Sequence, residues 1–210
     1  MMSDDAPAGA VVAAGAAPSI LIVTPAAWNR LDLDPRTRAA SLAALVTGRL
    51  GDGADMLASR RELVAALRGF ARDAAASGAI YAAIMLAAID GVAVQASLVA
   101  SVADIATAQP DPAALTAMLA AGCERTDDHE SSTLSALVGE CARLVTVIST
   151  PIDSDLAIPA LVAQYAVPIP LTTRAVVFSF STPNVEVRAS MLRLFDRIVG
   201  AARWTGAAAS

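Results

Sequence analysis

The sequence LVAQYAV at positions 161–167, followed by RAVVFSFS at positions 174–181 and then by Thr182-Pro183, decides the fold of this chain. Both runs are rich in β-branched and aromatic residues, which favour strands. Val176, Phe178 and Phe180 alternate along the second run, so they share one face of a strand. Thr182-Pro183 is typical of the start of a helix. We therefore predict an antiparallel hairpin with a helix packed across it.

The helix that follows Pro183 has a single apolar stripe. Its members recur at helical spacing and are Val187, Met191, Leu194, Phe195, Ile198 and Ala202. The arginines of this segment fall on the other side. Burying about five such side chains against the strand contributes on the order of 10 kcal/mol before conformational entropy is counted. We expect positions 161–204 to anchor the fold.

Further elements follow from strand-like runs and from helix capping signals. Further strands are predicted at positions 19–24, 79–89, 92–102, 134–138 and 143–148. Further helices are predicted from Pro35, with Asp34 as the cap, at about positions 55–77, and at positions 113–121. Positions 124–132 are polar and acidic and predict a loop, and positions 151–159 a connector. Pairing of the strands at 134–138 and 143–148 as a hairpin, or their fusion into one bulged strand, stays open.

The apolar stretch at positions 79–103 is long enough to span a bilayer, but two features favour a β-hairpin. Asp90-Gly91 near its centre is a strong signal for a two-residue turn, and a carboxylate at that depth in lipid is costly. The flanks lack the aromatic and basic anchors of a membrane helix. We predict two long strands that are apolar on both faces, with no membrane span.

Length and composition indicate one soluble domain with a core of small side chains. The chain has 210 residues, 56% of them hydrophobic and only 4% aromatic. These values suit a single domain over positions 19–204 with disordered tails at 1–18 and 205–210. The predicted fold class is α+β, with a mainly antiparallel sheet of about five to six strands and about three to four helices.

The charge and the cysteines exclude several classes of function. A net charge of -5 argues against nucleic-acid binding, which needs a basic face to neutralise phosphates. Cys123 and Cys141 are too few for a disulfide framework and are expected to be reduced, small core residues of a cytoplasmic protein. Four arginines on the second predicted helix offer either a solvated face or an anion-binding face. They are Arg60, Arg61, Arg68 and Arg72.

Reactive groups are scarce. The single histidine, His129, follows Asp127-Asp128 and precedes Glu130, a cluster that either binds a metal ion or forms a solvated loop. A hydrolase that pairs His129 with Ser179 or Ser181 is a further alternative. No phosphate-binding loop, nucleophile elbow or zinc-protease motif occurs. We assign no catalytic residue, cofactor or metal, and expect a non-enzymatic protein.

Four short motifs carry a resemblance to uncharacterised actinobacterial proteins. The motifs are P-x-x-W at Pro25 to Trp28, Q-Y-x-V-P-x-P at Gln164 to Pro170, F-S-T-P at Phe180 to Pro183, and L-F-D at Leu194 to Asp196. In the order of its elements the chain also resembles the Mog1/PsbP-like fold group. That resemblance implies a protein-binding adaptor or chaperone rather than an enzyme.

The predicted function is a protein-interaction module, which the resemblance extends to an adaptor or chaperone for a secretion or injection apparatus. The alternatives are a small-molecule or lipid carrier with an apolar cavity and a hydrolase using His129. The partner is another protein, and a homo-oligomer is compatible with the sequence. The predicted interaction surface comprises Trp28 and apolar residues of the central hairpin, namely Ile80, Ile84, Leu86, Val94 and Leu98.

Overall fold

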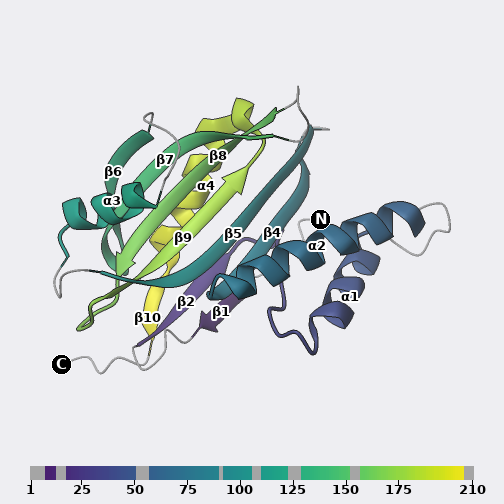
Figure 1. Cartoon of the computed structure of the whole chain (residues 1–210), viewed down its shortest axis with the longest axis horizontal. Helices are drawn as coiled ribbons and strands as arrows, with labels where there is room; N and C mark the ends of the chain where they lie inside the picture. Colours follow the sequence, from purple (N-terminus) through teal and green to yellow (C-terminus); the bar gives the residue numbers. More distant parts are fainter. Residues whose placement is uncertain are drawn as a thin grey trace, which may run out of the picture.

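The computed structural model describes residues 8–12, 18–50, 57–89, 92–105, 110–122, 129–151 and 157–205. These residues form one α+β domain (Figure 1). A seven-stranded antiparallel sheet holds, in order, β3 (Trp28–Arg30), β4 (Ala79–Ile89), β5 (Val92–Asp104), β9 (Arg174–Thr182), β8 (Ala157–Pro168), β7 (Gly139–Pro151) and β6 (His129–Ala136). A second sheet has the order β1 (Ala8–Val12), β2 (Ser19–Thr24) and β10 (Arg203–Thr205).

Four α-helices lie within the described residues. They are α1 (Arg38–Leu50), α2 (Leu57–Ala76), α3 (Pro112–Ala121) and α4 (Arg188–Ala201), the last preceded by the short 3-10 helix η2 (Val185–Val187). The predicted fold class is confirmed, with a sheet of seven strands where five to six were expected. None of these helices is long and apolar enough to cross a membrane.

The two faces of the large sheet are covered differently. One face, which we call the α4 face, packs against α4 and β2 through the fully buried Leu98, Phe178 and Phe180. On the opposite face, α1 and α2 cover β4, and α3 covers β7 and β8. We call this the α2–α3 face. Figure 1 shows α2 and α3 at opposite ends of it, with β5 and β9 between them.

The closing module is confirmed, although its helix begins later than predicted. Thr182 is the last residue of β9, and α4 begins at Arg188 after η2. β8 and β9 pair antiparallel, with Tyr165 opposite Phe178 and Ala163 opposite Phe180. Met191, Phe195 and Ile198 of α4 are buried against this hairpin, as the apolar stripe predicts. Alternation in β9 therefore aims its aromatic rings at the helix that follows it.

The central hairpin is also confirmed. β4 and β5 pair from Ala79 and Ser101 to Ile89 and Val92, so positions 79–103 form two strands. The predicted turn at Asp90-Gly91 lies outside the described residues. The hairpin alternative is likewise the observed one for β6 and β7, which join at Leu137-Val138 and at Gly139, whose φ of +108° favours glycine.

Three predictions are wrong in part. Residues 8–12 of the predicted tail form β1, which pairs with β2, and Thr205 belongs to β10. The predicted loop at 124–132 ends earlier, because β6 begins at His129. Polar side chains suit an edge strand that faces water, so polarity alone did not separate strand from loop. Residues 123–128 and 152–156 lie outside the described residues.

The start of α1 also differs from the prediction. Pro35 to Thr37 form a turn and the helix begins at Arg38, whose amide donates to the carbonyl of Asp34. The carboxylate of Asp34 accepts from the amide of Arg36. Asp34 therefore organises the turn that leads into the helix.

Candidate functional site

A strip of small polar side chains runs along the α2–α3 face. Directly opposed residues of neighbouring strands point to the same face of a sheet. β5 and β9 place Ser97 opposite Ser181 and Val99 opposite Ser179, and β8 places Gln164 opposite Ser179. We define the serine strip as the half-buried residues Ser97, Val99, Ser101, Gln164, Ser179 and Ser181.

The strip contrasts with the reverse side of the same strands. Leu98, Ala100, Phe178 and Phe180 on the α4 face are wholly buried, whereas the strip stays partly open to solvent between α2 and α3. Within it the amide nitrogen of Gln164 donates to the hydroxyl of Ser179 over 3.4 Å. The strip therefore offers hydroxyl and amide groups that are partly open to solvent.

A hollow of about 300 Å³, which we call the α2 groove, opens at one side of the strip. Its wall comes from Leu63, Leu67 and Phe70 of α2, and from Ile84 and Leu86 of β4. Its floor includes three polar residues, Gln95, Ser97 and Ser181. The groove therefore combines an apolar wall with a polar floor, which is the usual character of a binding pocket.

The residues of the predicted interaction surface differ in burial. Trp28, Ile84, Val94 and Leu98 are exposed by only 4%, 7%, 4% and 0%, so they belong to the core. Ile80 and Leu86 are half-buried. Of the six, Ile84 and Leu86 line the α2 groove. Both faces of the central hairpin are covered, chiefly by α2 and by α4, which accounts for the apolar residues on both sides of it.

The serine strip was missed at the level of sequence, although a signal was present. Ser179 and Ser181 alternate with Phe178 and Phe180, and Ser97 and Ser101 share the parity of Val99. A period of two with small polar residues on one side indicates a face that is only partly covered. Which segments cover it depends on the strand order.

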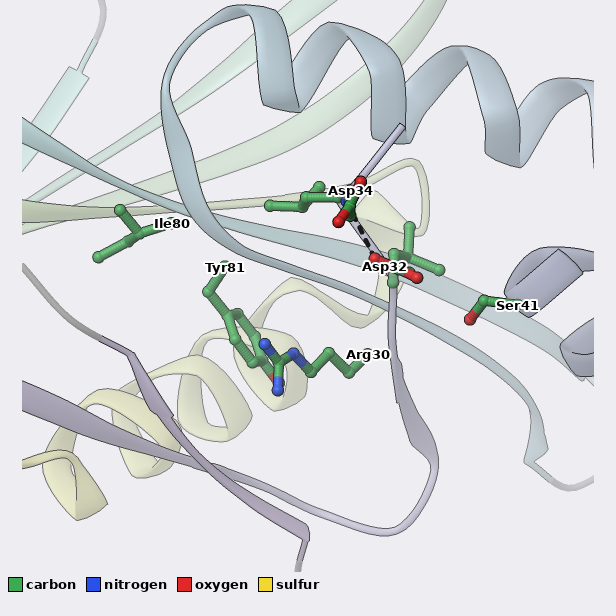
Figure 2. Close-up of a pocket in the computed structure, with 8 residues that line it drawn as sticks. Arg30, Asp32, Asp34, Ser41, Ile80 and Tyr81 are labelled. Carbon is green, nitrogen blue, oxygen red and sulfur yellow. Dashed lines mark hydrogen bonds between the residues drawn. The ribbon is translucent and has the colours of Figure 1, made fainter. Parts of the chain in front are cut away.

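A second hollow, of about 400 Å³, lies where the chain leaves β3 (Figure 2). The guanidinium of Arg30 stands 5.8 Å from the centre of the Tyr81 ring, and the two side chains lie alongside each other in Figure 2. Asp32, Asp34 and Ser41 complete its polar lining.

The two carboxylates of this hollow are occupied by the turn that they hold. The hydroxyl of Thr37 and the amide of Asp34 donate to Asp32, which lowers the pKa of its carboxyl group. The Arg36 side chain lowers the pKa of Asp34 through an ion pair at 2.7 Å, assisted by the Arg36 amide. Both carboxylates are therefore ionised at neutral pH and stabilise local structure, and neither is poised for proton transfer there.

The register separates His129 from the serines with which a hydrolase would pair it. His129 lies opposite Thr146, Thr146 opposite Val162, and Val162 opposite Ser181, so His129 and Ser181 share a face three strands apart. Three strand spacings amount to roughly 14 Å, far beyond a hydrogen bond. No Ser179–His129 or Ser181–His129 pair forms in this fold.

The candidate metal cluster also divides. His129 and Glu130 are neighbours on β6 and point to opposite faces of the sheet. Glu130 accepts from Arg188 at the start of α4 over 2.7 Å. Asp127 and Asp128 lie outside the described residues, and within the described ones no cluster of three metal-ligating side chains occurs.

A polar network is buried beneath α4. Arg143 of β7 donates to both oxygens of Asp196, at 3.1 and 2.8 Å, and the hydroxyl of Tyr165 donates to the same carboxylate. Burial, reinforced by this hydrogen bond, raises the pKa of Tyr165 far above its usual range. Burial, with the nearby charges of Asp196 and Glu140, raises the pKa of Cys141 to about 11. The thiol is therefore protonated and unreactive at neutral pH.

Comparisons with known proteins identify similar folds. No protein-family model matches the chain, and no curated protein matches it. Among solved structures, LpqN of Mycobacterium tuberculosis, which is involved in cell envelope biogenesis, is 14% identical with a TM-score of 0.47, over 97% of this chain and 94% of LpqN. The Ran-binding protein Mog1p of Saccharomyces cerevisiae is 11% identical with a TM-score of 0.44, over 92% and 91% of the two chains. These values describe a likeness of fold alone and transfer no site or activity. The resemblance to actinobacterial proteins through the four motifs stays a prediction.

Proposed function

We propose that the chain is a non-catalytic protein-interaction module that binds a segment of a partner protein in the α2 groove and along the serine strip. The carrying observation is the contrast between the two faces of β5 and β9, one wholly buried and the other lined by half-buried serines beside an apolar groove. A sheet face that served only for packing in the core would be apolar. A sheet face that served only as solvent-exposed surface would lack the apolar groove.

The chemistry of the surface selects the kind of segment. The leucine and phenylalanine wall suits one or two apolar anchor side chains, and the serines and Gln95 suit the backbone amides and carbonyls beside them. Burying these hydroxyls against an apolar segment without hydrogen bonds would be costly. The fitting partner is therefore a segment with apolar anchors and accessible backbone polar groups.

A narrower form of the proposal is an adaptor or chaperone for a secretion or injection apparatus in the cytoplasm. It is supported by the resemblance of the element order to the Mog1/PsbP-like fold group and by a groove of the kind that shields apolar segments. In a homo-oligomer, a second copy of the chain would supply the bound segment. Measuring the size of the protein in solution distinguishes this case from binding to another protein.

Photo-crosslinking tests the proposal. The photoreactive amino acid p-benzoylphenylalanine replaces Ser181 on the strip in one protein and Ser190, which is exposed on α4, in a matched control. We expect the strip position to give a defined crosslinked partner in cells and the control position to give none. Binding of that purified partner should then weaken at least tenfold in Ser97→Tyr, because the ring fills the groove. Equal crosslinking at both positions, or unchanged binding by Ser97→Tyr, contradicts the proposal.

A carrier of a small apolar molecule is the second candidate function. It is favoured by the same groove, whose volume of about 300 Å³ lies at the lower end of ligand pockets. Native mass spectrometry of the purified protein would then show a co-purified molecule that Leu86→Arg releases. A spectrum that shows only the ligand-free protein, together with no binding of an apolar fluorescent probe, rules out the carrier function. The protein-binding proposal is unaffected by that result.

A further inference from the structure

A third hollow lies between α1 and α2, on the side of α2 away from the α2 groove. Its volume is about 440 Å³, within the range of ligand pockets. Residues of both helices line it, namely Ala43, Val46 and Thr47 of α1 and Arg60, Arg61, Val64, Ala65 and Arg68 of α2. We call it the arginine hollow.

Three of the four arginines on α2 meet in this hollow, and the fourth does not. Arg60, Arg61 and Arg68 line it, whereas Arg72, one turn further along, pairs with Asp73 at 3.1 Å. The guanidinium of Arg60 donates to the hydroxyl of Thr47 over 2.7 Å, which ties it to α1. One arginine is therefore positioned by the helix pair.

The described lining of the hollow carries arginines without a carboxylate. Arg61 and Arg68 form no ion pair or hydrogen bond within the described part of the chain. Because the protein carries a net charge of -5, this local excess of cations runs against its overall balance. Clustered guanidinium groups bind anionic oxygens with charge-assisted and often bidentate hydrogen bonds.

The floor of the hollow is apolar. Val46 is buried, and Val64, Ala43 and Ala65 supply the remaining methyl groups. A hydrated inorganic anion would gain binding free energy from its contacts with the arginines alone. A molecule that joins an anionic head to an alkyl chain would gain from the arginines and also from burying the floor.

From these observations we infer that the arginine hollow binds an anionic single-chain amphiphile, with its phosphate or carboxylate on Arg61 and Arg68 and the start of its alkyl chain on Val46 and Val64. This site is separate from the α2 groove and does not rest on the function proposed for that groove. A merely solvated helix face would be expected to carry neither a 440 Å³ hollow nor an apolar floor beneath three guanidinium groups.

Calorimetric titration of the whole chain tests the inference with three probes. Decyl phosphate, below its micelle concentration, is expected to bind with one-to-one stoichiometry, and more weakly as salt is raised. Inorganic phosphate lacks the chain, and decyl maltoside lacks the charge. Each is expected to bind at least tenfold more weakly. Phosphate binding as tightly as decyl phosphate, or no binding of decyl phosphate, overturns the inference.

Two variants locate the binding. The double variant Arg61→Gln/Arg68→Gln should weaken decyl phosphate at least tenfold, and Ala65→Trp, which fills the hollow, should do the same with the charges intact. Arg72→Gln removes an arginine from the same helix outside the hollow and should leave the affinity unchanged. Circular dichroism melting confirms that each variant is folded. Equal loss in Arg72→Gln, or no loss in the double variant, places any binding elsewhere and overturns the inference.

Discussion

The hydroxyl of Tyr165 lies 2.7 Å from Oδ1 of Asp196 and donates to it, joining the middle of β8 to the last turns of α4. Arg143 completes the arrangement with two hydrogen bonds to the same carboxylate. One carboxylate, one-quarter exposed, therefore holds two strands and a helix together. The two residues come from the Q-Y-x-V-P-x-P and L-F-D motifs, which lie far apart in the sequence.

Removing the Asp196 carboxylate should lower the free energy of unfolding more than removing the hydroxyl of Tyr165. Tyr165→Phe leaves the Arg143–Asp196 pair intact and is expected to lower the free energy of unfolding by about 1–2 kcal/mol. Asp196→Ala leaves both Tyr165 and Arg143 without their acceptor and should cost about 3 kcal/mol or more. Urea unfolding measures both values. Equal costs would mean that the carboxylate is solvated and the network contributes little.

Cys141 should make the protein less stable in alkaline solution. Its pKa rises from 9.0 to about 11 on folding, so the unfolded chain loses the thiol proton first. This contribution to stability is therefore complete below about pH 9 and is lost as the pH rises toward 11, with a slope of at most about 1.4 kcal/mol per pH unit. Tyr165, whose pKa is also raised, acts in the same direction at higher pH.

The measurement compares Cys141→Ala with its parent, both carrying Cys123→Ser so that one thiol is observed. Urea unfolding between pH 8 and pH 11 should show a shallower decline in the alanine variant. In the parent, the folded thiol should resist a disulfide exchange reagent at pH 8, because its sulfur is buried and protonated. Rapid modification under native conditions would contradict both the burial and the raised pKa.

Trp28 should tolerate phenylalanine but not alanine. Its ring packs edge-on against Phe180 and Phe195, with centroid distances of 6.1 and 6.5 Å. Its indole nitrogen is buried without a hydrogen-bond partner among the described residues, so Trp28→Phe sacrifices no hydrogen bond. We expect a cost of about 1 kcal/mol for Trp28→Phe and about 3–5 kcal/mol for Trp28→Ala. Thermal melting distinguishes them, and similar costs would indicate a partner for the indole nitrogen.

Asn184 should stabilise the end of the central hairpin. Its side-chain oxygen accepts from the amide of Gln95 at 2.9 Å, and its nitrogen donates to the carbonyl of Ala93 at 3.1 Å. This side chain thus continues the pairing with β5 beyond the end of β9. Asn184→Ala should cost about 1–2 kcal/mol. Asn184→Asp keeps the acceptor and loses the donor, so its free energy of unfolding should lie between those of the wild type and Asn184→Ala. The rate of hydrogen exchange at the Gln95 amide should follow the same order.

His129 should be dispensable for both stability and partner binding. It is exposed at an edge strand and lies roughly 14 Å from Ser181, three strand spacings away. His129→Ala is expected to change the free energy of unfolding by less than about 0.5 kcal/mol and to leave partner binding unchanged. If the wild type hydrolyses any ester or peptide probe, and His129→Ala abolishes that activity while the fold is kept, the separation of these residues must differ in solution.

The local elements followed from local signals. Alternation in β9, the apolar stripe of α4, the cap at Asp111, which accepts from the amide of Ala114, and the length of the strands around Asp90-Gly91 predicted those elements with nearly correct bounds. The first part of the edge strand β6, positions 129–133, and the strand β1 were missed. A polar strand and a small-residue strand have weak periodicity, and each is stabilised by pairing with the strand that follows it in the chain.

The sequence by itself determined the fold class, the closing module and the lack of any known catalytic motif, because these depend on periodicity and on residue type. Only the tertiary structure decided which faces are covered. Strand order and register buried Trp28, Val94 and Leu98, brought Ser97 beside Ser181, and kept His129 three strands from Ser179 and Ser181. The packing of α1 on α2 likewise divided the arginines, placing Arg61 and Arg68 along a hollow and leaving Arg72 outside it. Contacts between segments far apart in the chain arise from the sum of many weak packing energies, which no local pattern records.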